Sequence, residues 1–227
     1  MTDAQDPLQA LYPHLAGAGA GREAGDPALL ESLRLKADDH RAVLDAFLAE
    51  QGPAVVAAAR TLAEVYRAGG RLLLMGNGGS SCDAAHVAVE FLHPVTAGRP
   101  ALTAINLTAD IAMMTAVGND VGFAQVFVRQ LIAQGRRGDC LMGLSTSGNS
   151  SNLVAAFAKA REMGVRTLGL AGGEGGEMAR LGLDHCLVVR TDSIHRVQEC
   201  HVLVYHVLWD LVHTLLAGDR RPLGEAA

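Results

Sequence analysis

From residue 72 onward, the chain alternates short, uninterrupted apolar runs with segments long enough to form helices. The apolar runs cover residues 72–75, 102–107, 140–144, 167–170 and 186–189. Continuous apolar strands of this length, separated by helices, indicate a parallel sheet covered by helices on both faces. Three of the runs end directly in loops of glycine, hydroxyl-bearing and polar residues, with the sequences GNGGSS, STSGNSS and AGGEGG. Ligands of such sheets bind beyond the carboxyl ends of the strands, so these loops are the first candidates for a binding site.

The segment before the first apolar run is predicted to be helical. Apolar residues recur at helical spacing from residue 27 to residue 68, and Gly52-Pro53 predicts a break into two helices. Residues 196–216 predict a single, strongly apolar helix. Residues 1–26 are rich in Ala, Gly, Asp and Pro and predict a mobile extension, and residues 218–227 predict a short tail. We therefore expect one α/β domain over residues 27–217 and no second domain.

Composition narrows the classes of partner. The formal net charge of −5 disfavours binding to nucleic acid. No uninterrupted apolar run approaches the roughly 18 residues of a membrane span, and the first residues lack the pattern of a signal peptide. The four cysteines are far apart and form no CxxC pair, which favours reduced thiols. The expectation is a cytoplasmic protein that binds neither nucleic acid nor membrane.

The STSGNSS loop joins a predicted strand end to a predicted helix start. A helix N-terminus offers free amide groups and a partial positive charge, which favour an anion, and Gly148 lets the backbone approach a ligand closely. The loop lacks the lysine of a nucleotide-binding Walker loop, so a single phosphate monoester fits better than a triphosphate. A serine-rich turn that binds only water has the same pattern. The candidate phosphate-binding residues are Ser145, Thr146, Ser147 and Ser150.

The GNGGSS loop has only part of a dinucleotide fingerprint, because Ser81 stands where GxGxxG requires a third glycine. Two glycine-hydroxyl loops at one crevice nevertheless argue for a phosphorylated ligand with further polar groups. The helix predicted after this loop is expected to be capped by Ser81 or Asp83.

Two helices carry candidate catalytic or metal-binding side chains. His86 and Glu90 are four residues apart and share one helix face, where they suit a metal site or an acid–base pair. A surface ion pair has the same spacing. On the last helix, Gln198 and His206 are eight residues apart, roughly 80° around the axis, so both can reach one site. Spacing leaves three competitors for these roles open, namely Glu199, His201 and His213.

Four separated motifs, in order, resemble the phosphoheptose isomerase branch of the sugar isomerase (SIS) family. They are GNGGSSCDAAHVAVE, VGND, STSGNSSN and RVQECHVLVYH. The resemblance covers about residues 51–216 and implies a single SIS domain, a five-stranded parallel sheet between helices in a flavodoxin-like three-layer sandwich. It also implies a homotetramer with sites between subunits, and isomerisation of sedoheptulose 7-phosphate to D-glycero-D-manno-heptose 7-phosphate through an enediol(ate).

The resemblance also implies roles for individual residues. Glu90 and His206 match the catalytic base and acid. The metal-binding set, usually for zinc, corresponds to His86, Glu90, Gln198 and His206. The residues that match the sugar-binding set are Asn77, Gly78, Ser80 and Asp120, with Gln198 also facing the substrate and the four STSGNSS residues binding its phosphate. A carboxylate that binds zinc is a poorer base, so the two roles of Glu90 compete.

Two positions depart from the family pattern. Many heptose isomerases carry arginine where this chain has Pro94, and aspartate where it has His195. These differences leave open an isomerase of another sugar phosphate. A further alternative is a SIS-fold phosphosugar sensor without catalysis, although such relatives tend to lose the paired histidine and glutamate.

Overall fold

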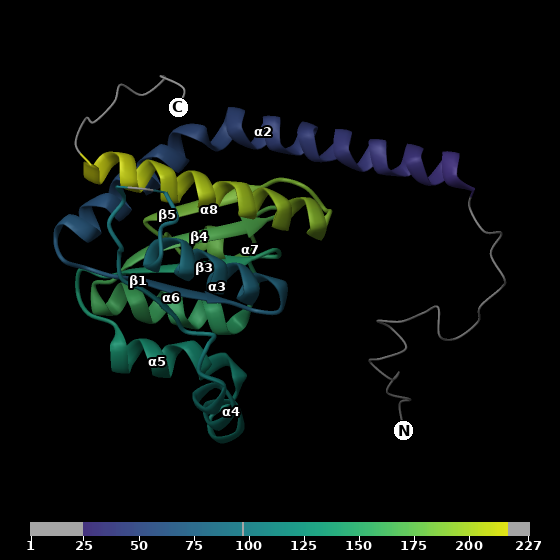
Figure 1. Ribbon diagram of the computed structural model, residues 1–227. Coiled ribbons are helices and arrows are strands. Elements are labelled where there is room, and N and C mark those ends of the chain that lie inside the picture. Colours follow the sequence, from purple (N-terminus) through teal and green to yellow (C-terminus); the bar gives the residue numbers. More distant parts are fainter. Residues whose placement is uncertain (1–24, 97, 218–227) are drawn as a thin grey trace, which may run out of the picture. The chain divides into compact units, whose positions relative to one another are not determined.

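The computed structural model describes residues 25–96 and 98–217 (Figure 1). The chain divides into two compact units at Asp38 and Asp39, and the second unit contains the sheet and all the candidate site residues. The predicted C-terminal tail lies outside the described residues, as does the predicted N-terminal extension except for Gly25 and Asp26.

The sheet has five strands, all parallel, in the order β2-β1-β3-β4-β5. The strands are β1 (Leu72–Gly76), β2 (Ala104–Asn106), β3 (Cys140–Ser145), β4 (Arg166–Gly172) and β5 (His185–Val189). Each predicted apolar run corresponds to one of them. Because β1 pairs with β2 on one side and β3 on the other, the direction of winding changes between β1 and β3. The loops GNGGSS and STSGNSS follow these two strands, so they meet at the place where open parallel sheets bind ligands.

Helices cover both faces of the sheet (Figure 1). They are α2 (Asp26–Arg67), α3 (Gly79–Leu92), α4 (Ile111–Asp120), α5 (Val126–Gln134), α6 (Ser151–Met163), α7 (Gly176–Arg180) and α8 (Ile194–Ala217), with a 3-10 turn η2 (Phe123–Gln125). One core cluster joins Leu72 and Leu74 of β1 to α2, α3 and α8, and a second joins Leu73 and Met75 to α4, α5 and α6. Successive residues of β1 therefore enter opposite cores, which explains why the strand is apolar at every position. The expected three-layer fold is confirmed.

The predicted break at Gly52-Pro53 is wrong, because α2 runs continuously through Pro53. Proline removes only one amide donor, and its fixed φ is compatible with a helix. Residues on both sides of it, including Phe47 and Val55, are buried in the same core cluster. Burial of those side chains offsets the lost hydrogen bond and keeps one helix.

Within the part of the chain that the structure describes, two helices reach the length and mean hydropathy of a candidate membrane span, although neither contains an uninterrupted apolar run of that length. They are α2 and α8. The apolar side chains of α8 include Val204, Leu208 and Val212, all of which are buried in the core cluster against the sheet. Its hydropathy is thus accounted for by packing inside the domain.

Candidate functional site

The first loop of the site is a tight turn between β1 and α3. A side chain at Gly76 would place a Cβ 2.3 Å from the carbonyl oxygen of Ser80, and Gly78 has a φ of +54°, which favours glycine. A Cβ at Gly79 would lie 2.7 Å from the amide nitrogen of Gln198 on α8. The glycines therefore let the start of α3 lie directly against the start of α8.

The predicted capping of α3 by Ser81 or Asp83 is wrong. Gly78 is the N-cap residue, and the Ser81 hydroxyl donates to the Gly78 carbonyl. The carboxylate of Asp83 instead accepts a hydrogen bond of 2.8 Å from the Gln198 amide nitrogen. Burial raises the pKa of Asp83, although the hydrogen bond from Gln198 and the charge of His86 oppose the increase. Since the nitrogen of Gln198 is bonded to Asp83, the amide oxygen is the atom that Gln198 can offer to a ligand.

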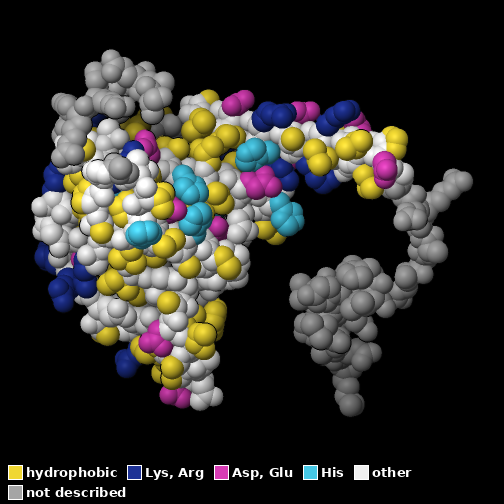
Figure 2. Space-filling view, in the orientation of Figure 1, with side chains coloured by type: hydrophobic (Ala, Val, Ile, Leu, Met, Phe, Trp, Pro, Cys, Tyr) yellow, Lys and Arg dark blue, Asp and Glu magenta, His cyan; other side chains and the backbone are white. Residues whose placement is uncertain are grey.

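Farther along the same pair of helices, His86, Glu90 and His206 come together. One candidate ligand atom from each residue lies within 4.8 Å of the others. Nε2 of His86 is 3.3 Å from Oε1 of Glu90, and the His86 and His206 ring centroids are 5.0 Å apart. Histidine side chains are visible on the molecular face shown in Figure 2. His86 and Glu90, which helical spacing placed on one face, therefore lie beside His206, the residue of α8 that the family resemblance implied.

Hydrogen bonds orient both imidazoles. Nδ1 of His206 is 2.8 Å from the Val202 carbonyl oxygen, which can only accept, so Nδ1 carries the proton of the neutral ring. Its Nε2 then presents a lone pair. Nδ1 of His86 is 2.9 Å from the hydroxyl of Tyr205, a buried side chain of α8. Imidazole and carboxylate are common zinc ligands, so this donor set fits a divalent metal ion.

The three competing residues of α8 are engaged elsewhere. Oε2 of Glu199 lies 2.9 Å from both His40 and Arg196. His201 and His213 are buried. Nε2 of His201 donates to the Ala171 carbonyl at 3.1 Å, so this side chain links α8 to β4.

Burial lowers the pKa of His201 to about 4, which predicts a pH-dependent stability. Below about pH 6.5 the unfolded chain binds a proton that the folded chain excludes, so the free energy of unfolding falls as the pH falls towards 4. The contribution of His201 is about 1.4 kcal/mol per pH unit at most. Denaturant unfolding at several pH values should show a shallower dependence in His201→Gln. An unchanged slope in this variant contradicts the assignment, and His195→Gln, at an exposed position, serves as the control.

The STSGNSS loop connects β3 to α6 and is held by its own polar groups. The Ser145 hydroxyl is 3.1 Å from that of Ser150 and accepts the amide of Gly148 at 3.1 Å. Gly148 has a φ of +65°, and a Cβ there would lie 2.1 Å from the Gly175 carbonyl oxygen. The loop is therefore fixed against the AGGEGG segment and can exist only with glycine at this position.

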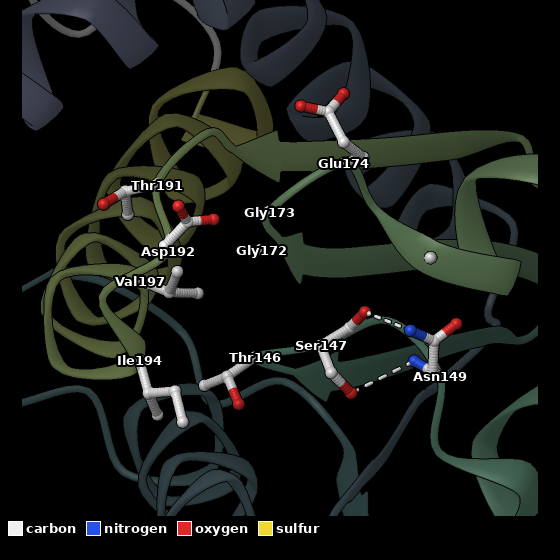
Figure 3. Close-up of a pocket in the computed structure, with 11 residues that line it drawn as sticks. Thr146, Ser147, Asn149, Gly172, Gly173, Glu174, Thr191, Asp192, Ile194 and Val197 are labelled. Carbon is white, nitrogen blue, oxygen red and sulfur yellow. Dashed lines mark hydrogen bonds between the residues drawn. The ribbon is translucent and has the colours of Figure 1, made fainter.

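Asn149 completes this packing. Its amide nitrogen donates to the Ser147 carbonyl at 3.1 Å, its backbone amide is 3.2 Å from the Ser147 hydroxyl, and its Oδ1 accepts from the amide of Glu177 (Figure 3). Asn149 thus orients Ser147, whose hydroxyl hydrogen is left to donate to a ligand.

A cleft of about 340 Å³ opens between this loop, the ends of β4 and β5, and the first turn of α8 (Figure 3). Its lining residues are Thr146, Ser147, Asn149, Gly172, Gly173, Glu174, Gly176, Thr191, Asp192, Ile194 and Val197. Of the four predicted phosphate-binding residues, Thr146 and Ser147 line the cleft. Ser145 is buried and bonded to Ser150 beneath it. Gly172, Gly173 and Glu174 also line it, but no residue of AGGEGG was chosen as a site residue, although this loop follows a strand in the same way as the other two.

Three of the predicted sugar-binding residues, Asn77, Ser80 and Asp120, lie in different parts of the domain. Asn77 and Asn152 exchange two amide hydrogen bonds, each 2.9 Å long, which tie the GNGGSS loop to the start of α6. Ser80 is buried in the first turn of α3. Asp120 ends α4, a helix that packs on the opposite face of the sheet from α3 and α8. Within the described chain, Asp120 therefore does not lie beside the cluster of His86, Glu90 and His206, here called the histidine group.

Comparisons with known proteins agree with this arrangement. The family model described as SIS domain matches residues 37–172. The phosphoheptose isomerase of Geotalea daltonii is 40% identical over 193 residues, which are 85% of this chain and 100% of that protein. The phosphoheptose isomerase of Chlorobium phaeobacteroides is 49% identical over 164 residues, 71% of this chain and 73% of that one. The structure of a phosphoheptose isomerase from Francisella tularensis superposes with a TM-score of 0.78 at 33% identity, covering 82% of this chain and 98% of that chain.

Proposed function

This chain belongs to the SIS domain family, and within it to the phosphoheptose isomerases, and we propose on that basis that it interconverts sedoheptulose 7-phosphate and D-glycero-D-manno-heptose 7-phosphate. The observation that carries the proposal is the joining of His86, Glu90 and His206 between α3 and α8. A regulatory protein that only binds a sugar phosphate has no need of a base and an acid held together beside the substrate.

The geometry suits a seven-carbon sugar phosphate. The cleft beside the STSGNSS loop includes Val197, and Gln198 and His206 follow on the same helix. At a rise of 1.5 Å per residue, His206 lies about 12 Å along the axis from Gln198. In sedoheptulose 7-phosphate, the phosphate and the reacting carbons C1 and C2 are at opposite ends of the molecule. We place the phosphate at the cleft and C1 and C2 at the histidine group.

Ketose–aldose conversion then needs two kinds of proton transfer. Glu90 removes a proton from C1, the electrons form the double bond of an enediol(ate), and the same carboxyl group returns a proton to C2. His206, with its lone pair on Nε2, accepts the proton of the C1 hydroxyl and supplies one to the oxygen on C2. Both groups come from rigid helices, which holds them in a productive orientation.

We further propose that a divalent metal ion, most simply zinc, is bound by His86, Glu90, Gln198 and His206. When bound there, such an ion would polarise the substrate carbonyl and would offset the negative charge that develops on the substrate. The two roles of Glu90 are compatible because a carboxylate has two oxygens. Oε1 faces His86, and Oε2 is then the atom that accepts the proton. Nε2 is the ring nitrogen that His206 has free, so a His206 that binds the metal cannot also move a proton, and the two roles of this residue are alternatives.

The active form is proposed to be a homotetramer in the cytoplasm, with sites between subunits. Half-exposed apolar side chains flank Glu90 on α3, at Val89 and Leu92, and Val95 is more exposed still. These side chains suit burial against a second copy of the chain. The four cysteines are free thiols, which suits a reducing compartment.

A panel of substrates tests the proposed function. The purified chain is incubated with sedoheptulose 7-phosphate, ribulose 5-phosphate, fructose 6-phosphate or unphosphorylated sedoheptulose, and the products are identified by NMR. We expect the heptulose phosphate to have the highest kcat/KM. Preference for a shorter sugar phosphate would support the alternative that Pro94 and His195 have changed the substrate, and binding without conversion would support a sensor.

Ser147→Ala is expected to weaken substrate binding more than it slows the reaction. Loss of one hydrogen bond to a charged phosphate is worth about 1–2 kcal/mol, which corresponds to a rise in KM of about 5- to 30-fold. The value of kcat should change by less than about threefold, because the hydroxyl is remote from C1 and C2. Steady-state kinetics measure both quantities.

Thr115→Ala is the matched control for Ser147→Ala, since the Thr115 hydroxyl donates only to backbone carbonyls of its own helix, α4. An unchanged KM in Ser147→Ala, or an equal rise in the control, would remove Ser147 from the phosphate site.

A further inference from the structure

The helix that presents Glu90 ends within one turn of it. α3 stops at Leu92, and the next residue, His93, has φ −135° and ψ 70°, outside the helical region. The cause is Pro94, whose ring disfavours a helical conformation of the residue before it. Glu90 therefore lies in the last turn of its helix, where carbonyl groups lose their usual partners.

Three of the four carbonyls in this last turn, those of Val89, Glu90 and Phe91, accept a hydrogen bond. The Val89 carbonyl accepts the amide of His93 at 2.8 Å, and the Phe91 carbonyl accepts the amide of Leu102 at 2.8 Å. In a longer helix, the carbonyl of Glu90 would accept the amide of residue 94, but proline has no N–H. The indole Nε1 of Trp209 donates to this carbonyl instead, at 2.8 Å.

The indole of Trp209 is itself held firmly between helix and loop. Its side chain is almost fully buried, the Arg99 guanidinium stacks over the ring at 4.5 Å, and the His213 ring meets it edge to face at 4.9 Å. Arg99 also forms a 2.6 Å ion pair with Asp210, the residue after Trp209. The indole donor is therefore rigid. A donor must be rigid if its hydrogen bond is to fix the position of the acceptor.

We propose that Trp209 is a positioning residue for the isomerase reaction, taking the place of the amide that Pro94 lacks. Its N–H anchors the last turn of α3, with Glu90, to the turn of α8 that carries His206 three residues earlier. This inference rests on the proposed function, because it supposes that Glu90 and His206 act on one substrate. Displacement of a reacting group by 1 Å lowers turnover by up to about 100-fold, so an anchor at Glu90 affects kcat directly.

Trp209→Phe removes the N–H and keeps an aromatic ring. We expect kcat for sedoheptulose 7-phosphate to fall about 10-fold while KM stays within about threefold, since the phosphate cleft is unaltered. Hydrogen–deuterium exchange of the peptide that contains Phe91, Leu92 and His93 should become faster, because the last turn opens more often. Val212→Ala is the control: it loosens α8 at another buried position without removing the hydrogen bond.

Pro94→Ala supplies the rescue, because alanine restores the missing amide and removes the restriction on His93. In the Trp209→Phe background, it should recover at least half of the lost kcat and slow the exchange of the α3 end. Equal kcat losses in Trp209→Phe and Val212→Ala would overturn the proposal, as would failure of Pro94→Ala to recover either readout. If the wild-type chain converts no ketose phosphate, the proposed function fails, while the exchange measurements still decide whether Trp209 anchors α3.

Discussion

Glu90→Gln is expected to lower the turnover of sedoheptulose 7-phosphate by at least about 10³-fold, which is within the range for loss of a general base. The amide has the shape of the carboxylate, but it cannot accept a proton from carbon. Glu90 lies at the junction of α3 and α8, and its Oε1 faces His86 at 3.3 Å. Because its side chain is part of no core cluster, the fold should survive the change. Conversion is followed by NMR, and thermal unfolding verifies the fold.

The matched control is Glu162→Gln on α6. Glu162 pairs with Lys159 at the surface at 2.6 Å, so its loss removes a carboxylate that has no part in the site. This variant should keep wild-type turnover. If Glu90→Gln retains turnover within tenfold of the wild type, the proton is removed by another group and the assigned base is wrong.

His206→Asn is expected to have the second-largest effect, a fall in kcat of about 10²-fold. The imidazole places Nδ1–H on the Val202 carbonyl and leaves Nε2 to move protons between the two oxygens of the enediol(ate). Asparagine has no atom that titrates near neutral pH, so this transfer is left to water. Steady-state kinetics by the NMR assay measure the loss.

The fold controls for His206→Asn are Thr214→Ala, two turns farther along α8, and the melting temperature of each variant. The metal content of purified His206→Asn should also be lower than that of the wild type, since one proposed ligand is gone. Turnover above half of the wild-type value in this variant would exclude His206 as the acid.

The strands could be predicted from sequence because helices cover both faces of the sheet. Leu72 and Leu74 enter one core while Leu73 and Met75 enter the other, so each strand appears as an uninterrupted apolar run. The end of the N-terminal helix was harder to predict. Pro53 is a local signal for a break, but the packing of Phe47 and Val55 on either side of it is a tertiary effect that the local sequence does not contain.

The cluster of His86, Glu90 and His206 could be predicted from the sequence only in part. Spacing placed His86 and Glu90 on one face, but it could not choose among Glu199, His201, His206 and His213 on α8. The structure makes that choice: His201 and His213 lie inside the domain, Glu199 pairs with His40 and Arg196, and His206 is only partly buried. The selection of His206 from family resemblance agrees with the geometry.

Polar pairs between distant segments could not be predicted at all. Gln198 bonds Asp83 across 115 residues, and Asn77 bonds Asn152 across 75. Such pairs depend on which loops meet after folding, and no local pattern marks them. Asp120 is a different case: α4 carries it on the other face of the sheet, so its proposed role in sugar binding remains a prediction for the assembled protein.

The central claim is that one chain of this sequence builds a base and an acid that move a proton between adjacent carbons of a sugar phosphate. Its most direct test is incubation with sedoheptulose 7-phosphate in ²H₂O, with and without a chelator, followed by ¹H and ²H NMR. The account predicts the heptose 7-phosphate with solvent deuterium at C2, at a rate that falls with chelator and returns with zinc. Unchanged ketose with no deuterium at C1, from a folded and metal-supplemented protein, would contradict it.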